Sequence, residues 1–134
     1  MDLFGKKNIS EDLERLNHEA EERDAERRAV EAKLPHINLF STSVNLDFLE
    51  KIPEERARLA EAAVVDSKQN ELAIAIFDKN NPELKKLVEE FNRAGISVSL
   101  FISSLRGLQH TWSRYREIKE APREGALEGV NIKE

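Results

Sequence analysis

The chain has 134 residues, enough for one domain and an additional segment but too few for a large catalytic domain beside a second module. Charged residues make up 35% of the sequence and aromatic residues 6%, which is typical of a soluble domain with a modest core. The net charge of -5 gives no general attraction to nucleic acid or anionic lipid. Any basic surface must therefore be local.

The absence of cysteine excludes disulfides and thiolate zinc sites, and a cytoplasmic protein fits this composition. His18, His36 and His110 are the only soft metal ligands that remain. The start "MDLFGKKNIS" has no apolar core of a signal peptide, and no later apolar run approaches the roughly 18 residues that a membrane span needs. We expect a chain that is neither exported by this route nor inserted in a membrane.

Residues 1–33 have the pattern of a charged helix. Ser10 can cap it, and acidic and basic residues four positions apart support it, as in Glu11/Arg15, Glu19/Arg23 and Asp24/Arg28. Leu13, Leu16, Ala20, Val30 and Leu34 fall on a heptad seam, but Arg23 and Arg27 interrupt its middle. We predict a charged helical arm that is solvated or partly frayed rather than a coiled coil.

Residues 34–119 carry nearly all the large apolar residues and form the predicted domain. "HINLF" at 36–40 predicts a short strand, and "NLDFLEKI" predicts a helix capped by Asn45. Pro53 can occupy the first position of the next helix, "PEERARLAEA". "AAVV" and "ELAIAIF", joined by the polar turn "DSKQN", predict a β-hairpin.

The second half of this domain begins with the helix "PELKKLVEEFNRAG", which has Asn81 as its cap, Pro82 at its first position and Gly95 as its stop. The alternating segment "ISVSLFI" predicts a strand covered on one face. A last helix opens at Ser103 or Ser104, and apolar residues on one side of it can dock on the sheet: Leu105, Leu108, Trp112 and Tyr115.

The predicted order is β-α-α-β-β-α-β-α, an α/β domain with a mixed sheet of three to four strands packed by helices. The hairpin is antiparallel, and the helix that connects the last two strands makes them parallel through a right-handed crossover. Residues 120–134, "EAPREGALEGVNIKE", contain proline and glycine without periodicity, and we interpret them as a flexible linker or tail.

Asp78 ends an apolar strand, as does the magnesium-binding carboxylate of many nucleotide hydrolases. No glycine pair fits the spacing G-x-x-x-x-G-K-[ST], so the phosphate-binding loop of such a site is missing from this sequence. Asp78 is then either a lone carboxylate at the end of a strand or a residue that turns the chain through "DKNNP". The second interpretation is favoured, because no second carboxylate or histidine lies nearby in sequence.

His36 and His110 have the sequence surroundings of surface or boundary residues, and no serine lies in a G-x-S-x-G elbow. An enzyme that used Asp78 and His36 would need both side chains at one pocket. We therefore expect no catalytic residues, no cofactor and no metal site in this chain.

The last helix carries Arg106, Arg114, Arg116 and Lys119. Basic residues that alternate with aromatic ones could bind single-stranded nucleic acid. However, Trp112 and Tyr115 continue the apolar stripe and should face the core, which disfavours nucleic acid as a ligand. We predict that these four basic residues form a solvated face or a protein-docking face.

Taken in order, four segments resemble a known family: "LPHINL", "VNLDFLEKIPEERARLAEAAVV", "NELAIAIFD" and "NPELKKLVEEFNRAGISVSLFISSLRGLQHTWSRY". They look like the N-terminal, MshEN-like domain of type II secretion and type IV pilus assembly ATPases. The likeness spans residues 34 to about 119. The Pro-x-Ile-x-Leu start, the "L-x-x-I-P-E-E-x-A" helix pair and the strand that ends in aspartate carry it.

The resemblance implies a domain that does not hydrolyse ATP and that docks a motor onto cytoplasmic parts of an inner-membrane platform. The docking surface would be the last helix or the exposed edge of the sheet. Oligomers would form only through a downstream motor, if one is present, and the location would be cytoplasmic or peripheral to the inner membrane. Some family members bind cyclic di-GMP through Arg-Leu-Gly repeats. This sequence lacks such repeats, so a nucleotide-sensing module ranks behind docking as the alternative function. The family commonly has Asp-Pro after the strand, whereas "KNN" separates Asp78 from Pro82 here.

Overall fold

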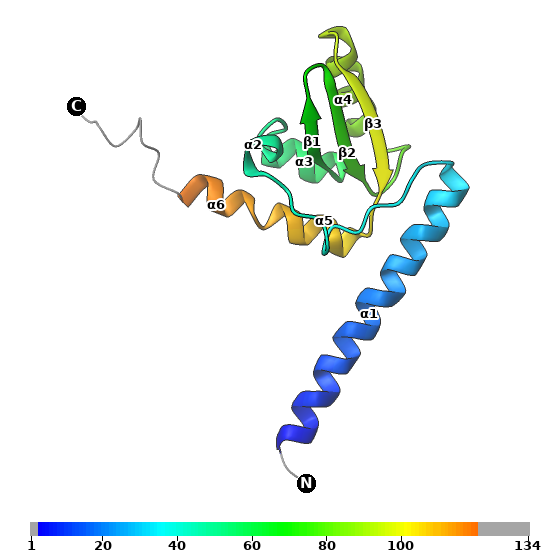
Figure 1. Cartoon of the computed structure of the whole chain (residues 1–134), viewed down its shortest axis with the longest axis vertical. Coiled ribbons are helices and arrows are strands. Elements are labelled where there is room, and N and C mark those ends of the chain that lie inside the picture. The colour runs from blue at the N-terminus through cyan, green and yellow to red at the C-terminus, as the bar shows by residue number, and fades with distance from the viewer. Residues whose placement is uncertain (1–2, 121–134) are drawn as a thin grey trace, which may run out of the picture.

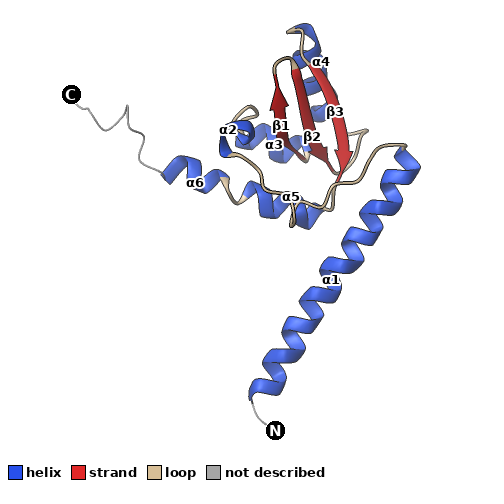
Figure 2. Ribbon diagram, in the orientation of Figure 1, coloured by secondary structure: helices blue, strands red, loops and turns tan. Residues whose placement is uncertain are grey.

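The computed structural model describes residues 3–120, in which a long helix precedes a small sheet with helices around it (Figures 1 and 2). The helices are α1 (Leu3–Ala32), α2 (Leu46–Leu49), α3 (Glu54–Ala60), α4 (Pro82–Arg93), α5 (Leu105–Trp112) and α6 (Tyr115–Glu120). The strands are β1 (Ala62–Lys68), β2 (Glu71–Ile76) and β3 (Ser97–Ile102). The predicted α/β class is confirmed. None of the described helices combines the length and the apolar character that crossing a membrane requires.

The sheet has the strand order β1-β2-β3, with β1 antiparallel to β2 and β2 parallel to β3. The register places Ala62 opposite Ile76 in the hairpin and Ile76 opposite Ile102 in the parallel pair. The parallel pair follows from α4, which carries the chain back to the start of the sheet between the two strands. The predicted mixed sheet is confirmed with three strands.

The predicted strand at 36–40 is wrong beyond a single residue. His36 forms one isolated parallel bridge with Ile102, framed by hydrogen bonds from Ile102 N to Pro35 O (2.8 Å) and from Ile37 N to Ile102 O (2.9 Å). Asn38 then turns the chain away from β3. Its main-chain oxygen accepts from Thr42 Oγ1 (2.7 Å), and its side-chain oxygen accepts from Phe40 N (2.9 Å). Local side-chain bonds of this kind compete with strand pairing.

The predicted caps of two helices are confirmed. The Asn45 side chain accepts from Asp47 N (2.7 Å), and the Asn81 side chain accepts from Glu83 N (2.8 Å). Gly95 follows α4 with a φ of 84°, a conformation that suits glycine. Pro53, in contrast, is the N-cap of α3 rather than its first residue.

Two boundaries differ from the prediction because of local packing. β1 continues through Lys68, with a register shift between Val64 and Asp66, so the hairpin turn is only two residues long. The last helix is broken at Ser113, whose hydroxyl donates to His110 O (2.6 Å). Beyond the break, Tyr115 docks on the α2 region.

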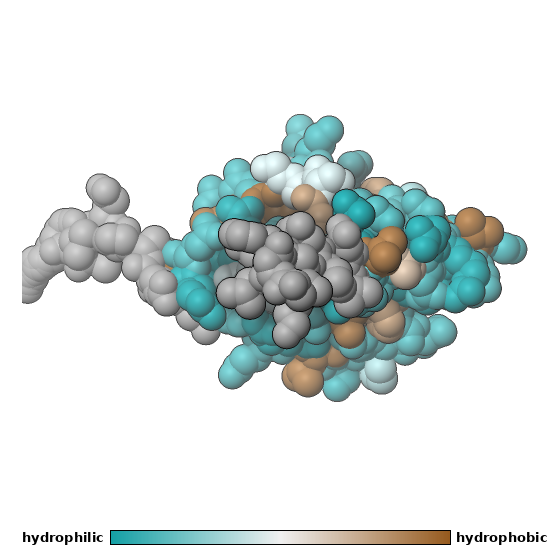
Figure 3. All heavy atoms as spheres, turned by 90° about the horizontal axis from the view of Figure 1, so that it is seen from below, coloured by the Kyte–Doolittle hydropathy of each residue, from teal (hydrophilic) through white to brown (hydrophobic). Residues whose placement is uncertain are grey.

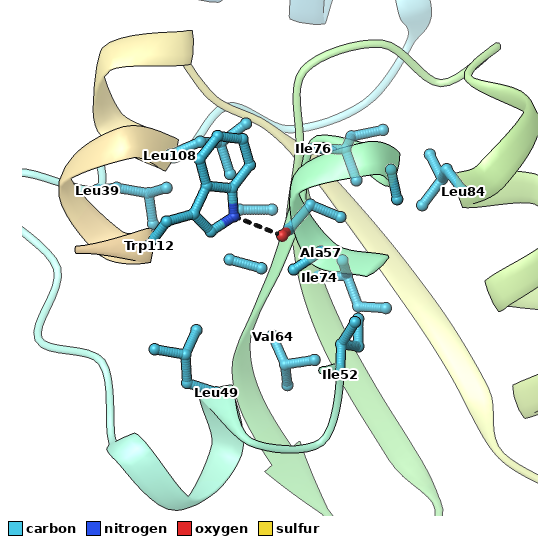
Figure 4. Packing of buried hydrophobic residues seen from close by; sticks show 14 of the residues in the cluster. Leu39, Leu49, Ile52, Ala57, Val64, Ile74, Ile76, Leu84, Leu108 and Trp112 are labelled. Carbon is cyan, nitrogen blue, oxygen red and sulfur yellow. Dashed lines mark hydrogen bonds between the residues drawn. The ribbon is translucent and has the colours of Figure 1, made fainter. Parts of the chain in front are cut away.

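The hydrophobic core lies between the sheet and the helices around it (Figure 4). Trp112 is buried there, and its Nε1 donates to Ala62 O (2.9 Å) at the start of β1. The Tyr115 hydroxyl contacts Leu49 O (3.1 Å) and Ile52 O (2.7 Å). The large fully buried side chains include Leu39, Leu49, Ile52, Val64, Ile74, Ile76, Leu84, Ile102 and Leu108.

The second half of α1 packs on the domain. The sequence had suggested a solvated or partly frayed arm over residues 1–33, and this expectation is wrong for the second half of α1. Ala25 and Ala29 are buried in the core cluster, whereas Val30 is 78% exposed. Figure 1 shows the N-terminal part of α1 extending away from the rest of the molecule. The boundary at residue 33 stays a prediction, and the predicted linker lies outside the described residues apart from Glu120.

Candidate functional site

The carboxyl ends of β2 and β3 meet the second half of α1, and Arg28 lies at the centre of this contact. Its Nη1 donates to Phe77 O (2.8 Å) and its Nη2 donates to Ser103 O (3.3 Å). The guanidinium also lies 4.2 Å from the centroid of the Phe77 ring. One side chain of α1 therefore joins the residues that directly follow both parallel strands.

Asp24 orients this arginine from one helical turn away. Arg28 Nε donates to Asp24 Oδ2 (2.9 Å), and the hydrogen bond holds the pKa of the Asp24 carboxyl below its usual value. Arg27 forms a second ion pair with the same carboxylate. The carboxylate thus stays charged at neutral pH and binds the same guanidinium that donates to both carbonyls.

Glu22 makes the second polar contact of α1. Its carboxylate accepts from Ser104 Oγ and lies 2.9 Å from His36 Nε2, and its side chain is only 13% exposed. Ser104 Oγ in turn accepts from Gly107 N (3.0 Å) as the N-cap of α5. The Glu22 carboxylate lies between Ser104 and His36. The Ser104 hydroxyl therefore donates to a carboxylate and not to an imidazole that could act as its base.

Small residues let α1 approach closely between these contacts. Ala25 and Ala29 are 0% and 3% exposed, and Ala32 packs against the same cluster. Sequence reasoning missed this stripe because it searched for large apolar residues on a heptad seam. Alanines spaced by three and four positions, with Glu22 and Arg28 beside them, were the available signal.

Two hollows lie on either side of Arg28 and Phe77, where ligands often bind in open α/β sheets. One has a volume of about 330 Å³ and is lined by Arg28, Glu31, Ala32, Phe77, Asp78, Lys79, Asn80 and Ile102. The other has a volume of about 400 Å³ and is lined by Glu21, Asp24, Arg28, Phe77, Ser104, Leu105, Arg106 and Gln109. Arg28 separates them, so α1 occupies the middle of the region.

Asp78 turns the chain, as the favoured interpretation predicted. Its Oδ1 accepts from Asn80 N (2.9 Å), and its main-chain oxygen accepts from Asn81 N (3.2 Å) ahead of α4. His36, by contrast, is bound to Glu22. The two residues of the enzyme hypothesis therefore have separate structural partners. Among the described residues, no group of three or more metal-ligating side chains is placed to hold a metal ion.

Two of the four predicted docking residues have partners within the chain. Arg106 Nε donates to Glu21 Oε2 of α1 (2.8 Å), and Arg114 donates to Val44 O and to Glu117 (3.3 Å). Arg116 is exposed on α6. Lys119 is also in α6, but its side chain lies outside the described part of the chain.

His110 and His18 meet at Phe40. The His18 ring is stacked on Phe40 with centroids 4.6 Å apart, and His110 is tilted against the same ring at 5.0 Å. This cluster joins α1, the 33–45 segment and α5. Together with His36 and Glu22, it makes the docking of α1 largely polar and aromatic.

The face seen from below is mostly hydrophilic, with separate hydrophobic spots around its centre (Figure 3).

The fold defines a small mixed α/β domain with an N-terminal helix docked at the carboxyl ends of its parallel strands. Solved structures with a similar fold include the following two. A structure of MshE with cdg matches with a TM-score of 0.61 and 24% identity, and the match covers 68% of this chain and 65% of that chain. The N-terminal domain of XpsE (crystal form I4122) matches with a TM-score of 0.55 and 14% identity, over 85% of this chain and 86% of that chain.

The predicted resemblance to secretion and pilus-assembly ATPase N-terminal domains is confirmed at the level of the fold. The chain spans just under two thirds of the MshE chain that it matches. No family model matches the sequence, and no curated protein matches it. The likeness therefore rests on three-dimensional structure.

Proposed function

We propose that this chain is a non-catalytic docking or regulatory domain of a type II secretion or type IV pilus assembly ATPase. The observation that carries the proposal is the fold that it shares with MshE and with the XpsE N-terminal domain. The partner would be the cytoplasmic part of an inner-membrane platform protein. An ATPase motor, if present, would lie downstream and would supply oligomerisation.

The contacts of the polar residues support a non-catalytic role. Asp78 caps a turn, Ser104 caps α5, and Glu22 joins Ser104 to His36. Each of these side chains has a structural partner that explains its position. A docking role needs no reactive group and draws instead on exposed surface.

The exposed Arg116 of α6 is the first candidate for the docking surface. Arg116 is exposed on α6, whereas Arg106 holds Glu21 and Arg114 holds Val44 O. An exposed arginine fits an acidic group on the platform protein, and such contacts at the rim mainly raise association rate and specificity.

The test is a calorimetric titration of the platform's cytoplasmic domain into wild type and into Arg116→Glu. Reversal of this charge should weaken binding by about tenfold, or roughly 1.4 kcal/mol, with a flatter salt dependence. Arg93→Glu is the matched control, because Arg93 is 75% exposed on α4. Equal affinities of the three proteins would remove α6 from the docking surface.

The affinity of the Arg106→Ala variant needs a separate interpretation, because this substitution also breaks the ion pair between Arg106 and Glu21 of α1. A lower affinity in this variant together with lower stability would indicate that α1 docking matters for binding. A lower affinity at unchanged stability would indicate direct contact with the partner.

A nucleotide-sensing module is the second candidate, and the MshE structure with cdg favours it. The sequence has no Arg-Leu-Gly motif, so we rank it below protein docking. Calorimetry with cyclic di-GMP separates the two. A dissociation constant below about 10 μM, or roughly 7 kcal/mol, would make nucleotide sensing the better account.

A further inference from the structure

The start of α5 receives three polar side chains from α1. The contacts join Arg28 to Ser103 O (3.3 Å), Glu22 to Ser104 Oγ, and Glu21 to Arg106 Nε (2.8 Å). In each contact the two residues lie between 75 and 85 positions apart in the sequence. The docked α1 and the first turn of α5 are therefore in direct contact, although the sequence separates them widely.

Ser104 uses one hydroxyl group for two bonds. Its oxygen accepts from Gly107 N (3.0 Å), which is the N-cap bond of α5, and its O–H donates to a carboxylate oxygen of Glu22. A hydroxyl that donates to an acceptor is polarised and becomes a better acceptor itself. The bond to Glu22 therefore strengthens the cap of α5.

The charge of Glu22 also acts on α5 as a whole. Anionic groups are stabilising near the N-terminus of a helix, where the first N–H groups lack partners within the helix. The Glu22 side chain is only 13% exposed, so water and salt screen its charge less than that of a surface carboxylate. Because Glu22 belongs to α1, this stabilisation reaches α5 only while α1 is docked.

Close packing leaves the first turn of α5 little room to adjust. Gly107 is buried, and a methyl group at this position would lie 3.1 Å from Ser104 Oγ and 3.2 Å from Leu39 Cβ. Ser104 itself is 1% exposed. Closely packed contacts of this kind have a few discrete arrangements rather than a continuous range. Loss of the cap should therefore open the first turn instead of shifting it slightly.

We propose that the docking of α1 and the first turn of α5 are coupled through Glu22 and Ser104, so that release of α1 loosens the start of α5. Such coupling is reciprocal, because one free energy links the two events. A partner that drew α1 away from the domain would then also loosen α5, and a ligand that held the first turn of α5 would hold α1 in place. The proposal does not depend on the ATPase assignment.

The first test is amide hydrogen exchange followed by NMR on the full chain. In Glu22→Ala, the Gly107 amide should exchange at least about fivefold faster relative to the Ile74 amide of the central strand β2, which reports global opening. Glu22→Gln retains an acceptor oxygen but not the charge, and it should give a smaller acceleration. Glu26→Ala is the matched control, because Glu26 lies on the same helix, is 62% exposed and approaches His36 Nδ1 (4.0 Å). An unchanged Gly107 rate in Glu22→Ala, or equal rates in Glu22→Ala and Glu26→Ala, would overturn the proposal.

The second test is a double-mutant cycle that measures reciprocity. Ser104→Ala should speed exchange of the Ala29 amide in α1 by at least about fivefold when Glu22 is present, and by less than about twofold when Glu22 is already alanine. Ser113→Ala is the control at the other end of α5, where the Ser113 hydroxyl donates to His110 O (2.6 Å), and it should leave the Ala29 rate unchanged. Equal accelerations by Ser104→Ala in both backgrounds would show independent contributions and would overturn the proposal.

Discussion

At the scale of single residues, two side chains join parts of the chain that are far apart in sequence. Arg28 connects α1 to the residues after β2 and β3, and Tyr115 connects α6 to the end of α2. Both donate hydrogen bonds to two main-chain carbonyls. Loss of either donor should therefore cost more than its surface exposure suggests.

We expect Arg28→Ala to lower the free energy of unfolding by about 1.5–3 kcal/mol, because two carbonyls and Asp24 lose a charged donor. Urea denaturation followed by Trp112 fluorescence measures the change. Arg27→Ala is the control, since Arg27 is 69% exposed and pairs only with Asp24 among the contacts described. The two variants should differ clearly; equal losses would show that Arg28 does not hold α1 in place.

Tyr115→Phe should cost about 1–2 kcal/mol, because the carbonyls of Leu49 and Ile52 lose their shared donor. Burial raises the pKa of the Tyr115 hydroxyl above its ordinary value of 10.0. A group whose pKa is raised on folding contributes stability below its ordinary pKa and loses it as the pH rises further. Wild type should therefore lose stability above pH 10 more steeply than the variant. Parallel pH profiles in urea denaturation would contradict this role.

At the scale of elements, sequence reasoning succeeded where local chemistry decides the outcome. Asn81, Pro82 and Gly95 fixed the ends of α4 before any tertiary contact was known, and the structure confirms them. It failed at 36–40, where Asn38 turns the chain after one bridge, and at Ser113, where the last helix divides. Both departures coincide with local side-chain bonds, at Asn38 and at Ser113, which hydrophobic periodicity does not encode.

The packing of α1 was the larger omission. Its contact stripe combines alanines with Glu22 and Arg28, so it looks like a solvated surface when only large apolar residues are counted. The candidate docking residues show the converse problem. Arg106 and Arg114 look free in sequence, yet each has a partner more than 60 residues away.

Ala29→Leu should destabilise the protein by about 1–3 kcal/mol or displace α1, because a buried alanine at 3% exposure leaves no room for a larger side chain. Val30→Leu adds apolar volume at the neighbouring position, which is 78% exposed, and should change stability by less than about 0.5 kcal/mol. Hydrogen exchange of the α1 amides reports displacement directly. Equal behaviour of the two variants would mean that α1 is not packed in solution.

At the scale of the whole molecule, the chain is a small domain with three distinct surfaces. The carboxyl ends of the parallel strands contact α1, α6 carries two basic and two acidic residues, and the outer edge of β3 is paired only at Ile102 among the described residues. Arg28 lies at the usual ligand position of an open α/β sheet, between two hollows that it lines. The two remaining surfaces are where we place partners.

The central claim is that the chain docks a platform protein and does not act on nucleotides. One NMR experiment tests it: amide spectra of the labelled chain are recorded with the platform's cytoplasmic domain, and then with Mg-ATP and with cyclic di-GMP. We expect micromolar binding of the protein, with shifts on α6 or along β3, and unchanged spectra with both nucleotides. Tight binding of a nucleotide together with no response to the platform domain would contradict the account.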